Sequence, residues 1–198
     1  PENIDEAIDY AVAHDTEFHQ FMLYTPVPGT PLFREHKEAG TLLDPDCEDM
    51  SDIHGQLRFN FRHPHIRDGQ EGEFLLRAFR RDFEVNGPSV VRMARTTLAG
   101  WKRYRKHPDA RIRERFRWEA RELATSYAGA VWAARRWFAD QPELCRKIDA
   151  VLRDLYRSLG LKSRLVAPLA GRYIFRKLRE EDARLQSGWT YEPPTFYE

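Results

Sequence analysis

The chain has 198 residues, of which 41% are hydrophobic and 13% aromatic, so it carries more apolar material than a disordered segment and enough for a folded core. Basic and acidic residues nearly balance, at 32 against 31, but residues 1–60 have a net charge of about −10 and residues 77–121 one of about +9. Two isolated cysteines, Cys47 and Cys145, exclude an iron–sulfur or zinc site built from this chain's thiols alone and favour a reducing compartment. With no membrane-spanning run and no signal peptide, we expect a cytoplasmic protein.

The first third of the chain is predicted to contain both strands and helices. Ile4, Ile8 and Val12 recur at helical spacing, which predicts a helix over residues 3–14. The aromatic run 18–25 predicts a strand, which a turn with three prolines and a glycine separates from a short helix over 32–39. Alternating apolar residues predict a second strand over 57–61. Strand, turn and helix in this order form a βα unit.

From Gly72 onward the periodicity is helical. We expect helices that end at Asn86-Gly87-Pro88, run from Ser89 to Lys106, and run from a cap at Asp109 to Phe138 as the longest element. Two more are expected over 142–160 and 162–185, the last kinked or split by Pro168, before an aromatic and proline-rich tail over 188–198. The predicted class is α+β, mostly α, with βα units over residues 1–70 and an all-helical extension over 71–198.

The turn over residues 25–31 is the most specific local pattern. Its prolines fix φ, and Gly29 can adopt a backbone conformation that other residues avoid. Rigid loops after strands suit ligand positioning, so Thr25, Pro28, Gly29 and Thr30 are candidate binding residues. A plain structural turn explains the same residues.

A resemblance rests on this turn. The stretch Phe-Met-Leu-Tyr-Thr-Pro-Val-Pro-Gly-Thr-Pro-Leu-Phe at 21–33, followed by Gly-Thr-Leu-Leu at 40–43, resembles a late barrel strand of radical S-adenosylmethionine enzymes. It is most similar to the cobalamin-binding branch, which includes methyltransferases and an anaerobic Mg-porphyrin ring cyclase. Residues 52–66 resemble the strand that follows in that branch, and the likeness covers about residues 1–85.

The resemblance implies the last βα units of a partial TIM-type barrel, with the residues Thr25, Pro28, Gly29 and Thr30 bordering the cofactor and substrate cavity. For the parent polypeptide it implies S-adenosylmethionine, a [4Fe–4S] cluster and, in this branch, cobalamin. The parent would carry out radical methyl transfer, cyclisation or oxidation at an unactivated carbon of a small molecule. This chain lacks the Cys-x3-Cys-x2-Cys cluster motif, so we expect it to be inactive alone and to pair with upstream domains of the parent.

Polar residues of the second predicted strand are candidates for lining the substrate pocket, namely His54, Gln56 and Asn60. His54, His63 and His65 also raise the question of a metal site, because imidazoles two apart on a strand share a face. No carboxylate or thiol accompanies them at a suitable spacing. A strand-to-helix turn explains the last two histidines, so no metal site is predicted.

The basic stretch supports an alternative function. Arginines and lysines of residues 92–121 alternate with Trp101, Tyr104 and Trp118, a pattern that can grip phosphates and stack bases. The alternative is therefore a helical binding module that docks nucleic acid or an acidic protein surface. Glutamates at helical spacing from these arginines also fit a solvated helix face, so nucleic acid is not the partner we expect. The aromatic tail fits docking to another protein, to the parent's other domains, or to the exposed barrel edge.

Overall fold

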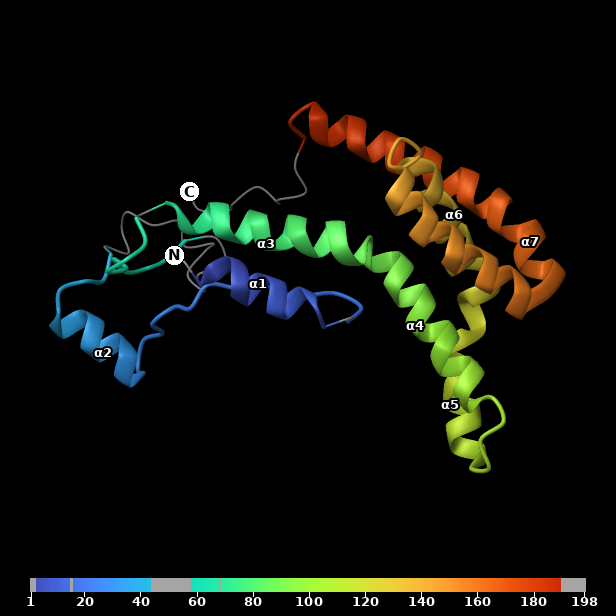
Figure 1. Ribbon diagram of the computed structural model, residues 1–198, viewed down its shortest axis with the longest axis horizontal. Helices are drawn as coiled ribbons and strands as arrows, with labels where there is room; N and C mark the ends of the chain where they lie inside the picture. Colours follow the sequence, from blue (N-terminus) through green and yellow to red (C-terminus); the bar gives the residue numbers. More distant parts are fainter. Residues whose placement is uncertain (1–2, 15, 44–57, 68, 190–198) are drawn as a thin grey trace, which may run out of the picture. The chain divides into compact units, whose positions relative to one another are not determined.

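A computed structural model describes residues 3–14, 16–43, 58–67 and 69–189, and helices dominate them (Figure 1). The predicted mostly α class is confirmed. The chain forms two compact units, Pro1–Asn86 and Gly87–Glu198. The division at residue 70, which separates expected barrel units from a helical extension, stays a prediction.

The first unit contains three described helices, α1 (Ile4–Val12), α2 (Pro31–Glu38) and α3 (Glu71–Asn86). α1 and α3 lie side by side (Figure 1). Their shared core consists of buried residues with two half-buried neighbours, namely Ile8, Val12, Ala78, Ile4 and Phe21. The apolar face predicted for residues 3–14 is therefore the face that packs on α3.

Two ion pairs border this helix pair. Arg77 donates to Asp5 and Arg81 donates to Asp9, both at 2.8 Å. Because both pairs advance by four residues on each helix, α1 and α3 run in the same direction. All four side chains are about half exposed or more, so the pairs set register and add little stability.

The two predicted strands are wrong for the described residues. Residues 18–25 run as extended chain, but no described residue pairs with them in a β-ladder. The second segment makes one isolated antiparallel bridge, between Leu42 and Phe61, and its start at Leu57 lies outside the described residues. A strand needs a neighbour for its N–H and C=O groups, and the described part of this unit supplies none beyond that bridge.

The extended segment nevertheless keeps the side-chain alternation of a strand. His19, Phe21, Leu23 and Thr25 are half-buried. Their neighbours Phe18, Gln20, Met22 and Tyr24 are exposed. The period-two pattern that predicted a strand therefore describes the local conformation correctly, although the ladder is missing.

The second unit is entirely helical over its described residues. Its α-helices are α4 (Ser89–Tyr104), α5 (Ala110–Glu119), α6 (Ala128–Trp137) and α7 (Pro142–Gln186). The core is formed by fully buried aliphatic side chains from α4, α6, α7 and the segment before α6, namely Leu98, Leu123, Val131, Ile148 and Leu155. The helical character expected from Gly72 onward is confirmed for the described residues of this unit.

The helix predicted from Asp109 to Phe138 is interrupted. Asp109 caps it as expected, since its Oδ1 accepts from the backbone N–H of Arg111 at 2.8 Å. A 3₁₀ turn (Ala120–Glu122) and a π-helical turn (Leu123–Tyr127) then separate α5 from α6. Neither turn contains glycine or proline, so the sequence holds no breaker signal that would have revealed the interruption.

α7 is the longest element, and it contains one break. Gly160 leaves the helical conformation (φ 69°, ψ −147°), as expected for a glycine that ends one helix and starts another. The helix continues through Pro168, so Pro168 does not split it, and the kink expected as the other possibility stays a prediction. The second helix of α7 begins after the break at Gly160, so Pro168 lies only seven residues after its first residue.

α6 and α7 approach closely through small residues, and they lie beside each other in Figure 1. A Cβ on Gly171 would lie 2.4 Å from a ring carbon of Trp132, and one on Gly129 would lie 2.8 Å from the Cβ of Ala170. Both glycines are therefore required by packing. None of the described helices combines the length and apolar character needed to cross a bilayer.

Candidate functional site

The loop over residues 25–31 is held in shape by contacts at the start of α2. Thr30 caps the helix, because its Oγ1 accepts from the N–H of Phe33 at 3.2 Å and donates to the carbonyl oxygen of Val27 at 2.7 Å. Pro31 occupies the first helical turn, where its missing N–H costs nothing. Gly29 has φ +89°, a conformation that other residues rarely adopt.

A hydrogen bond from Asn60, which lies later in the chain, also holds this loop. Its Nδ2 donates to the carbonyl oxygen of Pro26 at 2.9 Å, and Pro26 is fully buried. The structure thus brings one predicted pocket residue against the predicted loop. The other two, His54 and Gln56, lie outside the described residues.

Asn60 retains an unused acceptor. Its Oδ1 is buried and has no hydrogen-bond partner in the described part of the chain, although the residue as a whole is only partly buried. An unsatisfied buried acceptor costs roughly 1–3 kcal/mol. Such a group next to a rigid loop suits a ligand that brings a donor.

Glu71 is a functional candidate that the sequence analysis missed. It is 3% exposed, and its Oε1 accepts from the N–H of Phe59 at 3.1 Å. Its Oε2 is buried, and no residue that the structure describes forms a hydrogen bond with it. A glutamate at the start of a helix normally signals only the helix dipole, so the sequence holds no separate sign of this burial.

Glu71 and Asn60 therefore belong to one cluster. Glu71 accepts a hydrogen bond from the backbone N–H of Phe59, and Asn60, which is bonded to the loop, is the next residue along the chain. Each of the two residues has one buried oxygen without a hydrogen-bond partner among the described residues, and Asn60 is bonded to the loop at Pro26. This donor-poor arrangement can bind a cation or an N–H-bearing ligand group.

Aromatic and histidine rings on both sides of Asn60 in the chain contact one another and form a wall of packed side chains. The rings of His36 and Phe61 lie 4.3 Å apart, and those of Phe59 and His63 lie 5.3 Å apart. Thr41 is within 2.7 Å of His36 Nδ1, which ties the end of α2 to this wall.

His63 is held as a neutral imidazole by its surroundings. Burial lowers its pKa from 6.5, and the nearby His65 lowers the pKa further. Its Nδ1 accepts from the backbone N–H groups of His65 and Ile66, both at 3.1 Å. These bonds need a free lone pair on Nδ1, so the proton resides on Nε2.

An open polar hollow of about 640 Å³ lies beside the start of α3. Its lining is formed by His65, Arg67, Gly69, Gln70 and Glu73. Among the described residues, no group of three or more His, Cys, Asp or Glu side chains is placed to hold a metal ion.

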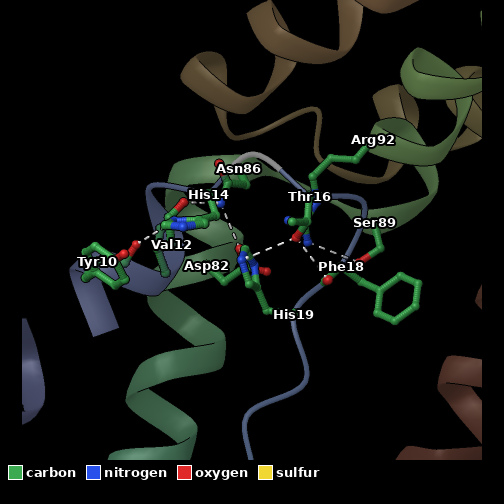
Figure 2. Close-up of polar contacts among 10 residues, drawn as sticks. All are labelled: Tyr10, Val12, His14, Thr16, Phe18, His19, Asp82, Asn86, Ser89 and Arg92. Atoms are coloured by element: carbon green, nitrogen blue, oxygen red, sulfur yellow. Dashed lines mark hydrogen bonds and ion pairs between the residues drawn. The ribbon is translucent and has the colours of Figure 1, made fainter. Parts of the chain in front are cut away.

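A second polar cluster fixes the direction of the extended segment (Figure 2). His19 Nδ1 donates to Asp82 Oδ1 at 2.9 Å, and both side chains are mostly buried, at 13% and 8% exposed. Asn86 donates to the same oxygen at 2.8 Å and to the carbonyl oxygen of Val12 at 2.9 Å. The cluster therefore ties α1, α3 and residues 18–25 together.

Thr16 lies next to His19, so a hydroxyl, an imidazole and the carboxylate of Asp82 follow one another. Its Oγ1 lies 3.2 Å from His19 Nε2 and donates to the carbonyl oxygen of Phe18 at 3.1 Å. The hydroxyl proton is thus directed to a carbonyl and not to the imidazole. We assign this cluster a positioning role.

The basic stretch of the second unit is largely paired. On α5, Arg115 donates to Glu119 at 2.8 Å and Arg117 donates to Glu114 at 2.7 Å. Further partners are Asp109 for Arg111, backbone carbonyl oxygens for Arg113, and the ring of Trp118 for Arg121. These contacts leave fewer charges for phosphate than the sequence suggests.

Comparisons of the chain with protein-family models, with curated proteins and with solved structures give no match.

Proposed function

We propose that this chain is the C-terminal part of a radical S-adenosylmethionine enzyme of the cobalamin-binding branch. In this proposal residues 1–70 complete the barrel, and the loop over residues 25–31 borders the substrate and S-adenosylmethionine cavity. The upstream part of the parent supplies the [4Fe–4S] cluster and cobalamin, because the two cysteines of this chain lack the spacing that a cluster needs.

The observation that carries the proposal is that Asn60, which is bonded to the loop, and Glu71, which is bonded to the preceding residue Phe59, each have a buried oxygen without a hydrogen-bond partner among the described residues. S-adenosylmethionine has an ammonium group and a sulfonium centre, both positive. A buried carboxylate oxygen without a partner is the chemistry that would receive such a charge. Thr25, Pro28, Gly29 and Thr30 then act as the rigid rim, with Asn60 holding that rim in place.

The extended segment 18–25 also supports the proposal. It has the alternating exposure of a strand and lacks a ladder partner among the described residues. A barrel strand separated from its neighbours would have these two properties together. In the parent, the preceding strand would pair with it and cover its exposed apolar side chains.

The parent's reaction is a radical methyl transfer, cyclisation or oxidation at an unactivated carbon, and this chain shapes the pocket without forming the radical. The acceptors on Asn60 and Glu71 orient the bound molecule. The alternative of a nucleic-acid module is weaker, because the arginines of α5 are mostly engaged within their own helix.

The experiment is Glu71→Gln in the parent polypeptide, with Glu84→Gln on the same helix as the matched exposed control. We expect Glu71→Gln to lower product formation by about 10-fold or more, which corresponds to one lost charge-assisted hydrogen bond. Cluster content, measured by iron and sulfide analysis, should be unchanged in both variants. If Glu71→Gln and Glu84→Gln retain the same activity, the acceptor cluster does not border the reaction cavity.

A further inference from the structure

The second helix of α7 begins with a long stretch that contains basic residues and no acidic residue. Residues 161–179 contain six Lys or Arg residues and no Asp or Glu. The acids resume at Glu180 and Glu181, and there the helix forms intrahelical ion pairs such as Lys177–Glu180 at 2.6 Å. The segment before them is therefore a basic helix, typical of helices that bind membrane surfaces or acidic grooves.

One side of this basic helix is needed by the unit's own core. Ser163, Ala167 and Gly171 are buried, and Gly171 lies directly against Trp132 of α6. The small residues on this side allow the close approach to α6. The remaining sides of the helix are available to something else.

The opposite side carries an exposed apolar stripe. Leu161, Leu165, Leu169 and Tyr173 follow each other at intervals of four, and they are 73%, 65%, 66% and 59% exposed. Isolated exposed leucines are ordinary in proteins, but four large apolar residues in one row on a helix mark an interaction surface.

Unpaired cations accompany the stripe. Arg164, Arg172 and Arg179 are exposed, and none of them lies within ion-pair distance of a carboxylate on a described residue. The arginines of α5 differ in this respect, since Arg111, Arg115 and Arg117 each have an acidic partner. The free cations of α7 make the stripe complementary to a negatively charged surface.

We propose that this face of α7, defined by Leu161, Leu165, Leu169, Tyr173 and Arg172, docks on an anionic lipid surface. The helix would lie in the plane of the interface with its leucines inserted and its arginines at the headgroups. This inference does not depend on the proposed function of the first unit.

The spacing of the stripe favours a broad contact surface over the narrow seam of a coiled coil. Steps of four residues advance by about 40° around the helix, so four residues spread over about 120°. A partner helix in a coiled coil needs the narrower seam made by alternating steps of three and four. A fluid surface accepts the broad face, and the long arginine side chains that lie on this face can extend to the headgroups.

The test is flotation of the 198-residue chain with vesicles of phosphatidylcholine alone and of equal parts phosphatidylcholine and phosphatidylglycerol. We expect binding to the anionic vesicles, weaker binding at high salt, and little binding to the neutral vesicles. Arg172→Glu should lower the partition coefficient at least about 5-fold. The double change Leu165→Gln and Leu169→Gln should lower it by about 10-fold or more.

Matched controls separate the face from general effects. Arg117→Glu makes the same charge change on an exposed arginine of α5, and Leu185→Gln makes the same apolar change later in α7; both should bind like the unmodified chain. Circular dichroism confirms folding of each variant. Equal loss in test and control variants, or no binding to anionic vesicles, would overturn the proposal. So would binding of Ca²⁺-loaded calmodulin, used as an acidic-groove probe, without vesicle binding.

Discussion

At the scale of single residues, Gly29 determines the shape of the candidate loop. Its φ of +89° is strained for any residue with a Cβ, while the space around that position is open. Gly29→Val should therefore destabilise the first unit through backbone strain alone, by roughly 1–2 kcal/mol or more. Gly29→Asn should cost less, because asparagine enters the left-handed region more readily.

Urea unfolding of the two variants checks this expectation. A destabilisation by valine that exceeds that by asparagine supports the strained turn. Equal stability of the two variants would mean that Gly29 does not hold this conformation.

His63 provides the second expectation at this scale. Its pKa lies below 6.5 in the folded chain because burial disfavours the imidazolium. Between that lowered pKa and 6.5 the unfolded chain binds more protons, so stability rises with pH through this window and is lost as pH falls through it. Protonation of Nδ1 would also remove the two bonds from the N–H groups of His65 and Ile66.

Nuclear magnetic resonance titration of the imidazole measures this directly. We expect a pKa below 6.5 and the Nε2-protonated tautomer at neutral pH. A pKa of 6.5 or higher, or a proton on Nδ1, would contradict the environment described for His63.

At the scale of elements, the contact between α6 and α7 depends on glycine. A Cβ on Gly171 would lie 2.4 Å from Trp132, inside van der Waals contact, so Gly171→Ala must displace the indole or separate the helices. We expect a loss of about 1–3 kcal/mol in the free energy of unfolding. Leu165→Ala, on the exposed face of the same helix, should change it by less than about 0.5 kcal/mol.

Thermal and urea unfolding of both variants measures the difference. If Gly171→Ala is as stable as Leu165→Ala, the close packing of the two helices is wrong.

Helices were predictable because their signals are local. The 3.6-residue periodicity and the cap at Asp109 suffice to place the start of α5, and Gly160 marks the break in α7. The strand over 18–25 was predicted from alternation, which reports the conformation of one segment but not the presence of a neighbour. For the same reason the bridge between Leu42 and Phe61 was not foreseen.

The candidate site was predictable in part. The rigid loop follows from its prolines and Gly29, and Asn60 was named from its place on the second predicted segment. Glu71 was missed, because its burial depends on a bond to Phe59, twelve residues earlier in the chain. Long-range burial of a polar group leaves no local trace in composition or periodicity.

At the scale of the whole molecule, the two units carry different kinds of surface. The first presents buried acceptors and a rigid loop, which suit a small ligand. The second presents paired arginines on α5 and a free basic, apolar face on α7. The proposed roles of cavity wall and surface anchor follow from this difference.

The central claim is that this chain completes a radical S-adenosylmethionine enzyme. The most direct test is the coding sequence upstream of Pro1 in the same reading frame. The account predicts a Cys-x3-Cys-x2-Cys motif there, ahead of further βα units. A full-length reading frame without that motif would contradict it.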